Sequence, residues 1–294
     1  MSDTAASLKR KIGTAGELQS VVRTMKAVAA SSIGQYENAV RALEDYYRTV
    51  QLGLVACLGQ AQPLPLAAQA QRPTAGVVIA LVFGSDQGLV GQFNDVMADL
   101  VVKTLAGLPN QNTVWAVGER IRSRLGETDL TMGKSFRLPS SIGAITALVA
   151  QLLMEIETLR DSEHVAQVVV FHNSPHAGAI YGPGFKKLLP LDEAWRRDLT
   201  ALPWPTKLLP EVMNGGEAAL LAFVREYLFV SLFKACAESL TSENASRLAA
   251  MQRAEKNIDE LLETLKGSFH RLRQSGIDEE LFDVISGFEA LKSI

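Results

Sequence analysis

Apolar residues spaced three and four apart form long runs at both ends of the chain. The first run extends over residues 8–54 and the second over residues 216–294. This spacing predicts two long helices, each of which packs along another helix. All 11 prolines lie between Pro63 and Pro210, so neither run contains a helix breaker.

The middle of each run is built mainly from alanine and serine, over residues 27–32 and residues 239–250. Small side chains let two helices approach closely, so the two runs are predicted to pair as an antiparallel hairpin. Glycines interrupt the first run, and each costs about 1 kcal/mol relative to alanine in a helix interior. The first helix is therefore expected to depend on the surface that it packs against.

The hydrophobic pattern changes between the runs. Residues 59–73 contain three prolines and predict a linker. Continuous β-branched and aliphatic stretches then alternate with helical patterns, which predicts a small parallel α/β sheet. The expected order is a strand at 76–83, a glycine-rich loop at 84–94, a helix at 95–105, a strand at 113–117, helices at 119–125 and 140–160, and a strand at 165–172.

Residues 173–215 hold six prolines and are predicted to be loops that return the chain to the last helix, with room for one edge strand. Within them, the YGPG sequence at residues 181–184 predicts a turn. We therefore predict an N-terminal coiled-coil helix over residues 1–62, an α/β domain over residues 63–215 and a C-terminal coiled-coil helix over residues 216–294.

Composition changes this picture little. The chain is 47% hydrophobic and 21% charged with a net charge of −3, which suits a protein with a real core and gives no reason to expect nucleic acid as a partner. No signal peptide or membrane-spanning segment is expected. Cys57 and Cys236 lie far apart in apolar surroundings, so we expect two buried thiols in a reducing compartment rather than a disulfide.

The first helix is locally basic. Residues 1–36 contain five cationic residues and only two acidic ones. This pattern is typical of a solvated helix face, and it also fits a docking face for an acidic partner. The residues are Lys9, Arg10, Lys11, Arg23 and Lys26.

Candidate catalytic chemistry is weak. The loop at residues 84–94 follows a predicted strand, where α/β proteins bind phosphate, but its G-x-x-x-G-x-x-G spacing matches neither the dinucleotide fingerprint nor the P-loop. A structural turn is favoured, in which Asp86 caps the turn or accepts hydrogen bonds from backbone amides. His172 and His176 are separated by Pro175, so no zinc site is expected. We expect no catalytic residue, no metal and no cofactor.

The last helix ends in a group of apolar residues that have no matching stretch in the first helix. Such a helix end is expected to be covered by another protein. The residues are Leu281, Val284, Ile285, Phe288, Leu291 and Ile294.

Four segments resemble motifs of the γ-subunit family of F-type ATP synthases, in the family's order and over its usual length. They are RTMKAVAAS at residues 23–31, SDQGLVGQFN at 85–94, LTSENASRLAAM at 240–251 and RQSGIDEEL at 273–281. The resemblance implies an α/β protein with a long antiparallel coiled coil of N- and C-terminal helices plus a Rossmann-like parallel-sheet domain.

It also implies a rotor shaft that carries torque without catalysing a reaction. Its implied partners are the α and β subunits around the shaft, and the ε subunit and membrane c-ring at the α/β domain. The implied location is the cytoplasmic face of the bacterial inner membrane, as a peripheral subunit. The coupling ion, proton or sodium, stays open.

Particular positions follow from the resemblance. Contacts with β that carry torque are implied for Arg23, Met25, Lys26, Arg247, Arg273, Gln274 and Asp278. A bearing tip is implied for Ile285, Phe288 and Leu291, and a family loop for Asp86, Gly88, Gly91 and Asn94. With an acidic lever on β as partner, the docking interpretation of the basic face is now preferred.

Several positions depart from the family's pattern and indicate a divergent branch: Gln87, Val90, Gln92 and Asp278. Two other hypotheses remain beside the rotor: a free-standing coiled-coil adaptor with an α/β head, and a nucleotide-binding enzyme that uses residues 84–94.

Overall fold

The computed structural model describes residues 4–60, 76–108, 111–162, 165–176, 178–208, 212 and 217–292. The chain divides into two compact units. The helical unit consists of Met1–Ala29 with Leu248–Ile294, and the α/β unit consists of Ala30–Arg247. The predicted linker lies outside the described residues from residue 61 onward.

Two long helices confirm the expectation from the apolar runs. Helix α1 spans Ala5–Gln60 and helix α7 spans Glu217–Lys292, and each contributes to both units. Within the helical unit they run antiparallel, because Arg23 of α1 contacts Glu255 of α7 while the earlier Gln19 contacts the later Asp259.

The same antiparallel order holds within the α/β unit. The Tyr46 hydroxyl donates to the Glu226 carboxylate at 2.6 Å, and the rings of Tyr47 and Tyr227 stack with centroids 5.7 Å apart. Near the other end of this pairing, burial raises the pKa of Tyr36, and Cys236 of α7 lies close enough to raise it further. The predicted antiparallel hairpin is therefore present in each unit.

The described strands form one five-stranded sheet in the order β3-β2-β1-β4-β5. The first four strands are parallel, whereas β5 is antiparallel to β4. The strands are β1 (Val77–Phe83), β2 (Asn112–Val117), β3 (Met132–Phe136), β4 (Val165–His176) and β5 (Ala179–Leu189).

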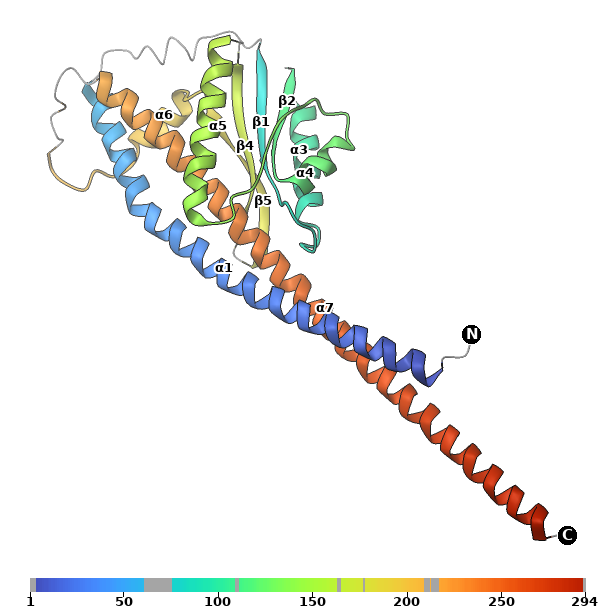
Figure 1. Cartoon of the computed structure of the whole chain (residues 1–294). Coiled ribbons are helices and arrows are strands. Elements are labelled where there is room, and N and C mark those ends of the chain that lie inside the picture. Colours follow the sequence, from blue (N-terminus) through green and yellow to red (C-terminus); the bar gives the residue numbers. More distant parts are fainter. Residues whose placement is uncertain are drawn as a thin grey trace. The chain divides into compact units, whose positions relative to one another are not determined.

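Helices cover both faces of this sheet within the α/β unit (Figure 1). Helices α1, α5 (Ile142–Ser162) and α7 pack on one face, and α3 (Phe93–Ala106) and α4 (Glu119–Gly126) on the other. The central strand β1 serves both cores, since Leu81 points into the first and Val82 into the second. This two-sided burial explains its uninterrupted apolar sequence.

Two elements between residues 130 and 200, strand β3 and helix α6, were missed by the pattern, whereas strand β5 is the edge strand for which residues 173–215 left room. Strand β3 lies at the sheet edge, and three of its five residues are exposed. Only its last residue, Phe136, is buried, so the strand has no alternating pattern. The YGPG sequence is not a turn; it lies inside β5, where Gly182 pairs with Ser174 and Pro183 with Asn173. Proline is tolerated there because β5 is an edge strand. Helix α6 (Glu193–Thr200) follows, capped by Asp192.

Both cysteines are free and buried in the α/β unit, as expected. Burial raises the pKa of the Cys57 thiol and, much more strongly, that of Cys236. Such thiols act as small apolar side chains rather than nucleophiles.

One described helix is long and apolar enough to cross a membrane by length and composition. It is the Ile142–Arg160 part of α5, with a mean hydropathy of 1.5. This helix supplies Ile145, Val149 and Leu152 to the core, where all three are fully buried. Packing in the core of the α/β unit accounts for these three residues, and 28% of the apolar window is buried.

Candidate functional site

The glycine-rich loop after β1 is closed by the first turn of α3. The Asn94 side chain accepts a hydrogen bond from the Ser85 backbone amide at 3.0 Å and donates one to the Ser85 hydroxyl at 2.8 Å. Ser85 is fully buried. Asn94 thus fixes the start of the loop to the start of the helix that follows it.

Asp86 connects three loops at the carboxyl ends of neighbouring strands. Its two carboxylate oxygens accept hydrogen bonds from the backbone amides of Glu119, at 2.9 Å, and Leu138, at 3.2 Å. Glu119 begins α4, so the Asp86 carboxylate also satisfies one of the free amides at that helix end. The expectation that Asp86 binds backbone amides is confirmed.

The two candidate glycines of this loop differ. Gly91 has a φ of 58°, which favours glycine, and the preceding Leu89 is also left-handed at 63°. A β-carbon at Gly88 would meet Arg120 at an ordinary 3.6 Å, so nothing in the backbone requires glycine there. Leu89 is 60% exposed and is the apolar tip of the loop.

The loop ends against helix α7 inside the α/β unit. The Ser246 hydroxyl donates to the Val90 carbonyl at 2.5 Å, and Val90 is buried. Two segments with a family resemblance are therefore joined directly. The contact explains the loop as a support for α7, and phosphate binding is not needed to account for its polar groups.

Arg247, the residue after Ser246 on α7, forms a buried ion pair with Glu243, one helical turn earlier. Its guanidinium donates to the Glu243 carboxylate at 2.6 Å and to the Asn244 side chain at 3.3 Å. The two charged side chains are only 12% and 7% exposed. Burial raises the pKa of Glu243, and Arg247 opposes that rise without cancelling it. Arg247, a predicted β contact, thus already has a partner in its own chain.

The basic residues of α1 also have a partner, in the helical unit. Glu255 of α7 accepts hydrogen bonds from Arg23 at 2.9 Å and from Lys26 at 2.5 Å. Between them, Met25 is half-buried. The spacing of apolar residues along the last helix does not single out Glu255. Its position opposite the basic residues of an antiparallel partner is the signal that would have identified it.

We predict that Glu255 titrates at an unusually low pH. Hydrogen bonds from Lys26 and Arg23 lower the pKa of its carboxyl group below the ordinary 4.5. NMR titration of the full chain should therefore give Glu255 a pKa below the ordinary 4.5. Replacing both Arg23 and Lys26 with alanine should return the Glu255 pKa to the ordinary range. An unchanged Glu255 pKa in that double variant would contradict the triad formed by Arg23, Lys26 and Glu255.

The remaining predicted residues lie farther along α7. Arg273, Gln274 and Asp278 are exposed, and Ile285 is 46% exposed. The side chains of Phe288 and Leu291 lie outside the described residues. Neighbouring exposed apolar residues extend this surface: Ile277, Leu281, Phe282 and Val284.

The predicted residues therefore form separate groups rather than one pocket. One group is the triad of α1 and α7, a second is the loop with the Glu243–Arg247 pair, and a third is the exposed end of α7. In the described part of the chain, no three histidine, cysteine or acidic side chains are placed to hold a metal ion. His172 instead contacts Glu238, with Nε2 3.0 Å from the carboxylate.

Comparison with protein families settles the kinship of the chain. The family model described as ATP synthase matches residues 4–291, which includes both terminal helices and the sheet. The chain belongs to the ATP synthase family.

Within this family, curated relatives named "ATP synthase gamma chain" match almost end to end. That of Moorella thermoacetica is 26% identical over 291 residues, covering 97% of this chain and 98% of the relative. That of Granulibacter bethesdensis is 27% identical over 296 residues, with the same coverage.

Solved structures share the fold. A chain of the Euglena gracilis mitochondrial ATP synthase, in a structure described as OSCP/F1/c-ring, has a TM-score of 0.67 at 17% identity, covering 98% of this chain and 94% of that one. A rotor chain of the same enzyme has a TM-score of 0.62 at 18% identity, with coverage of 93% and 98%. The predicted combination of coiled coil and α/β sheet is confirmed.

Proposed function

We propose that this chain is the γ-type central-stalk subunit of an F-type ATP synthase, the rotor that transmits torque between the membrane c-ring and the catalytic α/β hexamer. The observation that carries the proposal is the family match over residues 4–291. A free-standing adaptor or a nucleotide-binding enzyme would not need both terminal helices and the sheet to match one family together.

The structure supports a mechanical role. The antiparallel α1 and α7 are joined by paired charges in the helical unit, and α7 is fixed to the sheet domain through Ser246 and Val90 in the α/β unit. A shaft needs attachments of this kind so that a force on one part is not lost as local bending. Rotation would force successive nucleotide affinities on the β subunits, which hold the chemistry. This subunit itself is proposed to be non-catalytic and to need no cofactor.

The contact residues remain part of the proposal. Arg23, Met25 and Lys26 would meet an acidic lever of β, so Glu255 would share its cations with that lever. To contact β directly, Arg247 would have to break its ion pair with Glu243. Otherwise it would contribute by stabilising the conformation of α7. Arg273, Gln274 and Asp278 would grip a β loop, and the apolar end with Ile285, Phe288 and Leu291 would turn in a hydrophobic sleeve.

The location and division of the chain follow from the same proposal. The α/β domain would contact ε and the c-ring, which places the subunit at the cytoplasmic face of a bacterial inner membrane without inserting into it. Residues 1–62 and 216–294 would form the shaft, and residues 63–215 the base. Protons or sodium ions would drive it.

Co-expression with the α and β subunits of the same organism tests the proposal. We expect the chain to co-purify with them and to restore ATP hydrolysis, and we expect Arg273→Ala to weaken coupled ATP hydrolysis and ion pumping. Lys256→Ala is the matched control, since Lys256 is an exposed cation on the same helix, 78% exposed and 3.9 Å from Glu260. Elution of the chain alone, with no hydrolysis restored, would refute the rotor function.

A further inference from the structure

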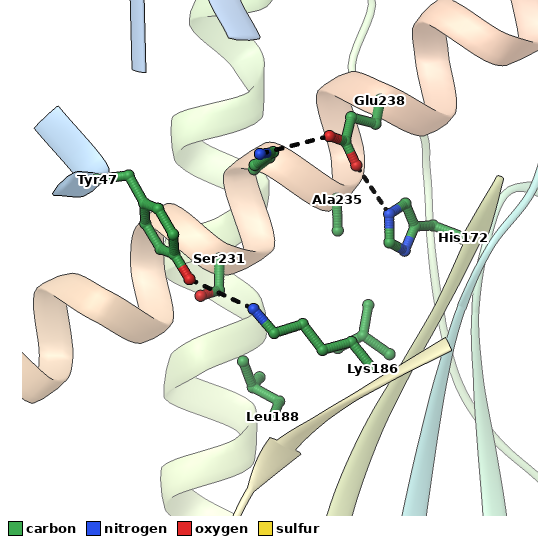
Figure 2. Close-up of a pocket in the computed structure, with 9 residues that line it drawn as sticks. Tyr47, His172, Lys186, Leu188, Ser231, Ala235 and Glu238 are labelled. Carbon is green, nitrogen blue, oxygen red and sulfur yellow. Dashed lines mark hydrogen bonds and ion pairs between the residues drawn. The ribbon is translucent and has the colours of Figure 1, made fainter. Parts of the chain in front are cut away.

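A cavity of about 240 Å³ lies in the α/β unit, between the edge of the sheet and the two long helices. Figure 2 shows its walls, to which β4, β5, α1 and α7 all contribute. The proposed rotor function makes no use of it. Its lining residues are Tyr47, Val170, His172, Lys186, Leu188, Ser231, Lys234, Ala235 and Glu238.

The cavity combines an apolar floor with a charged rim. Val170, Leu188 and Ala235 are buried aliphatic side chains. Lys186 extends from β5 toward Tyr47 of α1, and Glu238 projects from α7 toward the sheet (Figure 2). An apolar surface beside a few charged groups is the usual composition of a small-molecule site.

The single carboxylate of the rim is already engaged. One Glu238 oxygen lies 3.0 Å from Nε2 of His172, and the other lies 3.8 Å from the Lys234 ammonium. Glu238 is therefore engaged by His172 and Lys234 on its own side of the cavity. It does not form an ion pair with Lys186.

Lys186 is the cation left over. Its ammonium donates to the Tyr47 hydroxyl at 3.3 Å and lies 5.8 and 5.7 Å from the ring centroids of Tyr47 and Tyr227. In the described part of the chain no carboxylate lies within ion-pair distance of it. An ammonium has three N–H donors, so this arrangement leaves donors available to a ligand. Lys186 keeps contact with solvent, which gives a ligand a route of entry.

The charge of Lys186 persists at neutral pH. Burial by itself would lower the pKa of its ammonium, but the phenol groups of Tyr227 and Tyr47 outweigh burial, and the pKa is raised. Aromatic ring faces also favour the cation directly.

We propose that this cavity binds a small organic carboxylate, with the carboxylate on Lys186 and a short apolar body over Val170, Leu188 and Ala235. Sites for drug-sized ligands usually measure about 300 to 1,000 Å³, so a nucleotide would not fit this volume. A phosphate ion would leave the aliphatic floor unused and would bring a second negative charge to a single uncompensated cation. A monocarboxylate matches both the charge and the floor.

Binding would join elements that are far apart in the sequence. The cavity is walled by β4, by the edge strand β5 and by both long helices, so a ligand that binds the folded state would stabilise the α/β unit by mass action.

Benzoate is the probe for the experiment, with the full chain studied by calorimetry and thermal unfolding. We expect saturable binding of benzoate and a rise in melting temperature with its concentration. Lys186→Met should weaken binding by about tenfold or more, the effect of losing a hydrogen bond to a charged group. The matched control is Lys187→Met, because Lys187 is the next residue of β5, points to the other face of the sheet and pairs with Asp192. That variant should bind as the unaltered chain does.

A second variant tests the cavity without changing a charge and without relying on a loss of stability. Ala235→Leu should fill the floor of the cavity, abolish benzoate binding and leave the melting temperature without benzoate equal or higher. The proposal would be overturned by absence of saturable binding, by equal affinities for Lys186→Met and Lys187→Met, or by displacement of benzoate by inorganic phosphate at equal concentration.

Discussion

Replacement of Arg247 by alanine is expected to lower the free energy of unfolding of the α/β unit by about 3 to 5 kcal/mol, the usual cost of removing one partner of a buried ion pair. The reason is that the Glu243 carboxylate, 7% exposed, would lose the guanidinium that lies 2.6 Å away. Urea unfolding followed by tryptophan fluorescence measures this unit selectively, since Trp115, Trp195 and Trp204 all belong to it.

The loss should depend on pH in a defined direction. Glu243 has a raised pKa in the folded chain, so the folded state binds its proton more tightly than the unfolded state does. Stability therefore falls as pH rises from the ordinary carboxyl pKa of about 4.5 toward the raised value. Arg247→Ala removes the opposing charge, which should raise the Glu243 pKa further and make this fall larger. Glu243→Gln should remove this dependence of stability on pH.

Matched variants separate the ion pair from a general effect of removing arginine. Arg122→Ala deletes a cation of the same unit whose pair with Glu119 is 3.7 Å long and more than half exposed, so it should change stability by less than about 0.5 kcal/mol. In a Glu243→Gln background, Arg247→Ala should cost less than it does alone. If Arg247→Ala behaved like Arg122→Ala, the residue would serve only an outside partner.

Gly118→Ala is the second substitution with a large expected effect, a loss of about 2 to 4 kcal/mol from combined backbone strain and overpacking. Gly118 has a φ of 117°, which side chains rarely adopt. Its added β-carbon would lie 2.8 Å from the Ser85 carbonyl oxygen, a backbone atom. That carbonyl also accepts the Arg120 amide at 2.8 Å, so it cannot move without cost.

Gly126→Ala is the control for this variant. Gly126 ends the same helix, α4, and a β-carbon there would meet nothing within 4 Å. We expect no loss of stability, because alanine is favoured over glycine in a helix. Urea unfolding by tryptophan fluorescence again measures the effect. Equal stability of the Gly118 and Gly126 variants would contradict the strained turn.

The sequence predicted those elements whose own residues carry a strong signal. The three-and-four spacing predicted α1 and α7. The unbroken apolar stretches predicted β1 and β4, because a strand that is buried on both faces of a sheet needs apolar residues at successive positions. Strand β3 escaped prediction since its exposed residues give no alternation. An edge strand within residues 173–215 was anticipated, but its position was not, because Gly182 and Pro183 imitate a turn. Pairing with β4 is a tertiary contact, which local propensity does not contain.

The candidate site was predicted unevenly for a related reason. Asp86 could be anticipated because a loop after a buried strand needs polar side chains to bind its free amides. Asn94 was indicated only by the family resemblance, which gave it no partner. The partners of Arg23 and Arg247 could not be anticipated in the same way. Glu255 is over 220 positions from Arg23, so only the register of the antiparallel helices reveals it. Glu243 lies four residues before Arg247, but spacing alone does not show that both are buried.

Proline inside β5 has a consequence for the subunit before it meets its partners. Pro183 has no N–H group, so this edge strand lacks one backbone donor at the position paired with Asn173. Gly182 and Gly184 add no side-chain contacts beside it. A second copy of the chain that docked here would find one backbone donor missing from the ladder of hydrogen bonds. Pro183 thereby disfavours pairing of newly made molecules through this strand.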